Sequence, residues 1–199
     1  MDPSPAAIFL SVRARMAISL MGTGAALAAP AGAALAAPAG AALAAPAAAS
    51  VHGPTAAQIR AALGAAERSK QLWATVNICT TTHQHGRLGL RGQMPSLGFA
   101  TDMYMTFEVT YQVWGSRGFK PLPTTKARVL VGQTTNKALQ IGRTYPFQTS
   151  TALLAGRITF EWRRSGKLLG RTTRRTTGHH SHVDFADPPG FSRSFCRLS

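Results

Sequence analysis

The sequence predicts an all-β fold, a sandwich of about seven strands that follows one short helix. Two observations support this prediction. From residue 72 onward apolar and polar residues alternate with a period of two, which is typical of strands with one buried face. Clusters of glycine, proline, serine and asparagine interrupt these runs at short spacing. The 199 residues carry too few charges (15%) and too many apolar side chains (45%) for a disordered chain, and the length excludes a large multidomain enzyme.

The segment 1–28 is predicted to be a secretory signal peptide. Arg13 and Arg15 precede a short apolar run over 16–27, and small residues follow, which is the pattern of such peptides. The run is too short and too rich in glycine and alanine for a membrane span. A buried alanine-rich helix is the alternative. The residues before Val12 do not suit a signal peptide, so Val12 or Met16 is an alternative start.

An eight-residue repeat follows this segment. The unit Gly-Ala-Ala-Leu-Ala-Ala-Pro-Ala occurs three times without a mismatch, at 24–31, 32–39 and 40–47. A proline in every unit prevents a long helix, and one leucine per unit can bury little surface. We therefore interpret 29–53 as a low-complexity Ala/Pro linker. Small-x-small cleavage patterns recur within it, so cleavage is expected anywhere from residue 28 to 49.

The remaining segment, 54–199, is predicted to form a single β-sandwich domain with a helix at its start. Thr55 and Gln58 have the spacing of a capping box. Apolar residues on one helical face then continue to about residue 69: Ile59, Leu63 and Ala66. The helix is expected to end there, because the period changes to two at residue 72.

The strands are predicted from alternation and from turn signals. The first covers 72–79, with Leu72, Ala74, Val76 and Ile78 on its apolar face. The clearest covers 103–114, and weaker strands are expected at 86–93, 126–131 and 138–149. A hairpin is expected at 157–175, because Ser165-Gly166 suits a tight two-residue turn. Many short strands with such turns are typical of a sandwich or a barrel, and we favour an immunoglobulin-like sandwich.

The chain has two cysteines, Cys79 and Cys196. In an oxidising compartment they are expected to form a disulfide, while two separate buried thiols are the alternative. A standard immunoglobulin domain places a tryptophan shortly after its first cysteine, but here the next one is Trp114. Cys79 is also out of phase with the apolar positions of its strand. The bond is therefore expected at the rim, between the first strand and the carboxyl-terminal segment.

Five short segments carry a family resemblance. They are Leu72-Trp-Ala-Thr-Val-Asn-Ile-Cys79, Arg91-Gly-Gln-Met-Pro95, Phe160-Glu-Trp-Arg-Arg164, Thr177-Gly-His179 and Asp187-Pro-Pro-Gly-Phe-Ser192. Over about 55–199 the chain resembles a family of small exported proteins of high-GC Gram-positive bacteria. The resemblance implies a β-sandwich with one disulfide and an extracellular location. It implies no assigned activity and no catalytic residue.

The chain is strongly basic, with 22 Lys+Arg against 7 Asp+Glu and a formal net charge of +15. The densest run of cations flanks the predicted hairpin: Arg163, Arg164, Lys167, Arg171, Arg174 and Arg175. Such a ribbon would attract anionic envelope polymers or lipid head groups. The alternative is an edge hairpin kept unpaired and soluble by its charge. Specific nucleic-acid recognition is not expected, because no motif for it is visible.

One cluster of metal-ligand residue types is visible, in the segment 179–184. It consists of His179, His180, His182 and Asp184, residue types that bind zinc or copper. A loop with adjacent histidines lacks the fixed geometry of a stable site, so an exposed loop is the favoured interpretation. A metal-dependent extracellular enzyme is nevertheless the second functional hypothesis.

No catalytic motif and no cofactor motif is visible. Glu108 and Glu161 fall on the polar faces of their strands, where they are expected to balance cross-strand arginines rather than to act as an acid/base pair. The leading hypothesis is therefore a secreted, non-catalytic binding or structural protein of the cell envelope or exterior. It would need no cofactor and would have no transmembrane span after processing. The sequence leaves its ligand and oligomeric state open.

Overall fold

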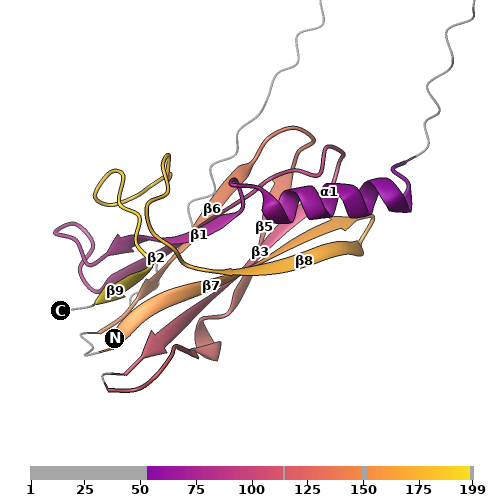
Figure 1. Ribbon diagram of the computed structural model, residues 1–199. Helices are drawn as coiled ribbons and strands as arrows, with labels where there is room; N and C mark the ends of the chain where they lie inside the picture. The colour runs from indigo at the N-terminus through magenta and orange to yellow at the C-terminus, as the bar shows by residue number, and fades with distance from the viewer. Residues whose placement is uncertain (1–52, 114, 149–151, 198–199) are drawn as a thin grey trace, which may run out of the picture. The chain divides into compact units, whose positions relative to one another are not determined.

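The computed structural model describes residues 53–113, 115–148 and 152–197. The chain divides into two units, 1–49 and 50–199, and all the described residues belong to the second. The predicted signal peptide and nearly all of the predicted linker therefore lie outside the described residues. The described part is mostly β, with one short α-helix and two antiparallel sheets (Figure 1), which confirms the predicted all-β sandwich.

The helix α1 (Ala56–Arg68) begins at the predicted capping box. The Gln58 N–H donates to the Thr55 hydroxyl at 3.3 Å, and the Thr55 N–H donates to the Gln58 side-chain oxygen at 2.8 Å. The helix packs on strand β8 (Lys167–Arg175), beside which it lies in Figure 1. Leu63 approaches Gly170 so closely that a Cβ there would overlap with its methyl groups. The glycine therefore sets how near the helix can lie to the sheet.

The smaller sheet has the order β1-β2-β6, with every pair antiparallel. Its strands are β1 (Trp73–Cys79), β2 (Arg87–Met94) and β6 (Leu139–Pro146). Both faces of β1 are buried. One packs on the core. The segment 176–194 covers the other, where the hydroxyls of Thr75 and Ser192 lie 2.8 Å apart, and it also pairs with the edge of β1 through backbone hydrogen bonds between Val76 and Arg193.

The larger sheet has two long central strands, β3 (Asp102–Gln112) and β7 (Leu153–Arg164), which pair with each other. On its other edge β3 pairs with β4 (Lys120–Pro121) and with β5 (Ala127–Gln133). A short 3-10 turn at Pro123–Thr125 connects β4 to β5. On its other edge β7 pairs with β8 and with β9 (Phe195–Arg197). The hairpin β7–β8 turns at Ser165 and Gly166, as predicted, and both have positive φ (47° and 77°).

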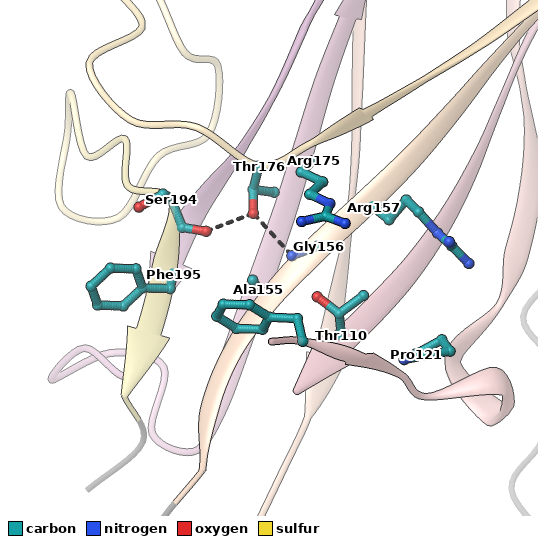
Figure 2. Close-up of a pocket in the computed structure, with 10 residues that line it drawn as sticks. Thr110, Pro121, Ala155, Gly156, Arg157, Arg175, Thr176, Ser194 and Phe195 are labelled. Atoms are coloured by element: carbon teal, nitrogen blue, oxygen red, sulfur yellow. Dashed lines mark hydrogen bonds between the residues drawn. The ribbon is translucent and has the colours of Figure 1, made fainter. Parts of the chain in front are cut away.

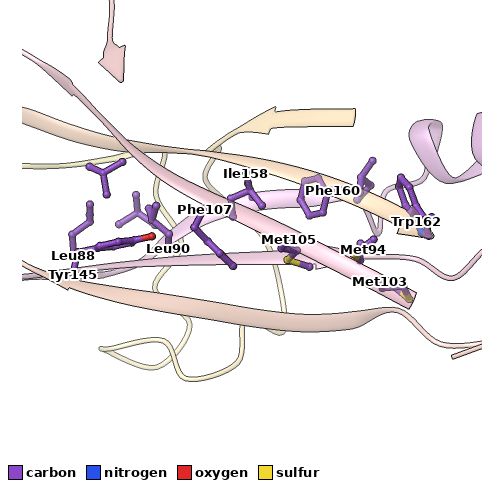
Figure 3. Close-up of a cluster of buried hydrophobic side chains, with 14 of the residues drawn as sticks. Leu88, Leu90, Met94, Met103, Met105, Phe107, Tyr145, Ile158, Phe160 and Trp162 are labelled. Atoms are coloured by element: carbon purple, nitrogen blue, oxygen red, sulfur yellow. The ribbon is translucent and has the colours of Figure 1, made fainter. Parts of the chain in front are cut away.

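The hydrophobic core lies between the two sheets (Figure 3). The larger sheet contributes alternate residues of β3 and β7, and β2 contributes alternate residues from the facing sheet. The core side chains with no exposed surface are Leu88, Leu90, Met94, Met103, Met105, Phe107, Val109, Ile158, Phe160 and Trp162, with Ala74 and Val76 of β1. The indole N–H of Trp162 donates to the Pro95 carbonyl at 2.9 Å, so this buried polar group is satisfied.

The predicted disulfide between Cys79 and Cys196 is confirmed. It joins β1 to β9 and therefore ties one sheet to the other at an end of the sandwich. The expectation that Cys79 is out of phase with the core is wrong, because a β-bulge separates Val76 from Ile78. Beyond the bulge Ile78 pairs with Gly89 on the outer face, and Cys79 pairs with the inward Leu88.

The described residues contain nine strands rather than about seven. The additional β4 and β9 have two and three residues, too short for an alternating pattern, and they exist because longer strands pair with them. Strand β7 also begins at Leu153, ahead of the predicted hairpin. No helix within the described ranges has the length and apolarity needed to span a membrane.

Candidate functional site

The outer face of the larger sheet gathers charged and hydroxyl side chains from four strands. Because side chains alternate along a strand, the residues next to the inward core positions of β3 and β7 point away from the core. We define the basic face by six cations, two carboxylates and three threonines. They are Lys126, Arg128, Arg157, Arg163, Arg171 and Arg175, with Glu108 and Glu161, and with Thr106, Thr159 and Thr173.

Both carboxylates of the basic face are held by arginines. Arg157 donates twice to Glu108, with its Nε at 3.0 Å from the carboxylate oxygen. Glu161 accepts from Arg128 at 3.0 Å and from Arg163 at 3.2 Å. Burial would raise the pKa of Glu161, but the hydrogen bonds from Arg128 and Arg163 and their charges lower it below its ordinary value. The predicted role of both glutamates in balancing charge is confirmed.

The other three cations of the basic face have no carboxylate partner within the described ranges. Lys126, Arg171 and Arg175 are exposed, and their side chains make no ion pair with a described residue. Arg175 lies directly opposite Arg157 in the β7–β8 register, an arrangement of like charges that costs free energy. An anion placed between the strands would relieve that repulsion.

Three hollows follow one another along the basic face. The first, of about 370 Å³, contains Thr106, Lys126, Thr159 and Arg171, and the second, of about 220 Å³, shares the first three of these. The third, of about 230 Å³, shares Arg157 with the second. Short threonines between long charged side chains form the floor. We call the first two hollows, which share three lining residues, the groove. It follows β7 from Glu161 to Arg157, which is about 13 Å at the rise of a strand.

The third hollow, which we call the end pocket, differs from the other two because apolar side chains line part of it. Phe119, Pro121 and Phe195 contribute to its wall, and Ala155 lies on its floor. Figure 2 shows Phe195 on one side of Ala155, with the guanidinium of Arg175 above the floor on the other. Arg157 lines the same pocket.

The cations predicted from the hairpin divide between two faces. Arg163, Arg171 and Arg175 lie on the basic face. Arg174 points the other way and donates to the Glu67 carbonyl at 2.7 Å, at the end of α1. The guanidinium of Arg164 lies beside Gly53, and Lys167 is exposed next to the turn.

Lys126, Arg128 and Arg157 belong to the basic face but were not part of the predicted run. They lie on β5 and β7 or just before β5, so no local cluster in the sequence marks them. The signal that could have found Arg157 is its spacing from Glu161, since residues of a strand that are separated by an even number share a face.

The histidines of the segment 179–184 do not assemble into a metal centre. The ring of His180 stacks on Trp73 with centroids 4.7 Å apart, and its Nε2 lies 2.7 Å from the Thr177 hydroxyl. His179 and His182 are exposed. Across the residues that the structure describes, no three His, Cys, Asp or Glu side chains are arranged to hold a metal ion.

Burial, and after it the charge of the neighbouring His179, lower the pKa of His180 below its ordinary value. The ring is therefore neutral near pH 7. In this structure it helps to hold the segment 176–194 on the outer face of β1.

Comparison of the chain with protein-family models, with curated proteins and with solved structures found no match. The geometry of the site itself is what characterises it: a groove about 13 Å long along a sheet, three cations without carboxylate partners among the described residues, and a partly apolar pocket at one end.

Proposed function

We propose that the protein is an exported, non-catalytic binding protein that docks on an anionic polymer of the cell envelope or exterior. The observation that carries this proposal is the groove of the basic face. Lys126 and Arg171 line it and Arg175 lies at its end, and all three are exposed and lack carboxylate partners among the described residues. A linear polyanion laid along these side chains would release its counterions, which favours binding.

The geometry favours binding over mere solubility. Charges that only protect an edge strand from pairing would be concentrated on that strand. Here the cations come from β7, β8 and the start of β5, and they line connected hollows. Thr106, Thr159 and Thr173 add hydroxyl groups on the floor of the first two hollows. Thr159 and Thr173 are hydrogen-bonded to each other at 3.0 Å, so the Thr106 hydroxyl and one hydroxyl of that pair are left to donate to phosphate, sulfate or carboxylate oxygens.

Export is part of the proposal. The predicted signal peptide supports it, and so does the disulfide between Cys79 and Cys196, since such bonds persist in oxidising compartments. The resemblance to small exported proteins points in the same direction. We further propose an immunoglobulin-like classification for the sandwich, on the basis of its two antiparallel sheets and the bond that joins them.

Salt-dependent binding to heparin and to long-chain polyphosphate tests the groove. The groove variant replaces Lys126, Arg171 and Arg175 by Gln. Its matched control replaces Arg60, Lys70 and Lys137 by Gln, which removes the same charge from exposed positions off the basic face. The groove variant should elute from heparin at lower salt than the wild type. With polyphosphate, its slope of log K against log salt should become shallower by about 2, because each neutralised phosphate accounts for ~0.7 of the slope.

The control variant should elute from heparin close to the wild type. If the two variants lose affinity equally, the attraction is a property of net charge alone, and the proposal of a docking groove is wrong.

A further inference from the structure

The end pocket has a composition that polyanion docking does not require. Its aromatic side chains Phe119 and Phe195 keep 36% and 50% of their surface exposed, although they lie against a charged groove. A repeating polyanion has no apolar groups that would pack against such walls. The pocket is therefore a separate feature whose ligand has to be inferred from its own residues.

The shape of the end pocket follows from the register of four strands. Pro121 pairs with Thr110, Thr110 with Ala155, and Ala155 with Phe195, so the four form one row across β4, β3, β7 and β9. The small side chain of Ala155 stands between much larger neighbours, and this leaves the hollow of about 230 Å³. A leucine at position 155 would occupy the floor of this hollow.

The polar groups of the pocket leave one strong donor available. Arg157 is held by Glu108. The Thr176 hydroxyl accepts from the Gly156 N–H at 3.0 Å and donates to the Ser194 carbonyl at 2.6 Å (Figure 2). The side chain of Arg175 has no hydrogen-bond or ion-pair partner among the described residues. A planar guanidinium presents two parallel N–H groups, which match the two oxygens of a carboxylate.

We propose that the end pocket binds a small monocarboxylate with an aromatic or branched apolar body. The carboxylate would pair with Arg175, and the apolar body would lie over Ala155 between the rings of Phe119 and Phe195. This site goes beyond the proposed docking on polymers, because it takes one small ligand with a single charge. The proposal predicts that neither the charge nor the apolar body suffices alone.

Binding of 2-naphthoate to the whole protein, measured by titration calorimetry, tests this site. Two comparison ligands separate the contributions: 2-naphthamide has the same body without the charge, and acetate has the charge without the body. We expect 2-naphthoate to bind and each comparison ligand to bind at least about tenfold more weakly. Equal binding of naphthoate and naphthamide would overturn the proposal, and so would no binding of naphthoate at low-millimolar concentrations.

Variants then locate the site. Ala155→Leu occupies the floor of the pocket. Phe195→Ser removes a half-exposed side chain from the pocket wall and leaves the core unchanged. Arg175→Gln removes the positive charge. Each should raise the Kd for 2-naphthoate about tenfold. Arg171→Gln, which removes the same charge outside the pocket, should change the Kd by less than about twofold. An equal effect of the two arginine variants, or wild-type affinity in Phe195→Ser, would contradict the assignment.

Ala155→Leu should leave elution from heparin unchanged, provided that its thermal unfolding matches the wild type. Loss of naphthoate binding with unchanged heparin elution supports the pocket as a separate site. A failure of the pocket and a failure of the groove are thus distinguishable.

Discussion

At the scale of single residues, His180 shows how a side chain that suggests metal binding in the sequence serves packing in the structure. Its ring stacks on Trp73, and its backbone N–H donates to the Ser192 hydroxyl at 3.1 Å. The stack joins the segment 176–194 to β1, and the hydrogen bond links His180 to Ser192, whose hydroxyl lies 2.8 Å from that of Thr75 on β1. Sequence alone could not show this, because the two stacked rings lie far apart along the chain.

The lowered pKa of His180 predicts a pH dependence of stability. Its folded-state pKa lies below the ordinary value of 6.5, so below that pH the unfolded chain binds the proton more readily. The contribution of the neutral His180 ring to the free energy of unfolding is complete above pH 6.5. It is lost as the pH falls toward the folded-state pKa. We expect the free energy of unfolding, measured by urea denaturation, to decline over this window.

His180→Phe keeps the stacked ring and removes the titration, so its free energy of unfolding should decline less over the same window. The exposed His179 and His182 remain in both proteins. Identical declines for the two proteins would show that His180 does not contribute.

At the scale of elements, local signals were sufficient for some parts and absent for others. The helix and the β7–β8 hairpin were predicted because a capping box and a Ser-Gly turn specify them within a few residues. Strands β4 and β9 were missed because only pairing with β3 and β7 defines them. The groove was missed in part for the same reason, since Lys126 and Arg157 come together only when β3 pairs with β5 and with β7.

The bulge of β1 is the clearest case in which alternation misleads. Ile78 was predicted on the core face, but the register shift turns it outward above Gly89. A Cβ on Gly89 would lie 2.6 Å from the Asn77 side-chain oxygen and 2.8 Å from Cβ of Ile78. The bulge therefore depends on a glycine in the neighbouring strand.

Gly89→Ala should consequently destabilise the protein, by about 1–3 kcal/mol if the strain resembles other overpacked cores. Gly64→Ala is the matched control. It lies in α1, where the added Cβ would meet only the flexible end of Arg68, and alanine should stabilise a helix by about 1 kcal/mol. Urea denaturation measures both changes, and a neutral Gly89→Ala would mean that the bulge relaxes freely.

At the scale of the whole molecule, the disulfide joins the two sheets over 117 positions of sequence. A bond that closes so long a loop restricts the unfolded chain, and the chain-entropy model puts its contribution at up to about 5 kcal/mol. Reduction with dithiothreitol should therefore lower the free energy of unfolding substantially.

The matched control is a variant with Ser at positions 79 and 196. Its stability should not respond to dithiothreitol and should be close to that of the reduced wild type. An unchanged stability of the wild type after complete reduction would contradict the role of the bond.

We propose that a single face of the sandwich, the basic face, binds the polyanion. Amide chemical shifts of the isotope-labelled protein, followed by NMR during titration with polyphosphate, test it most directly. We expect the largest changes to cluster on β3, β7 and β8, around Thr106, Thr159 and Thr173. Changes of similar size spread over all the basic surfaces, including those around Arg60 and Lys137, would contradict it.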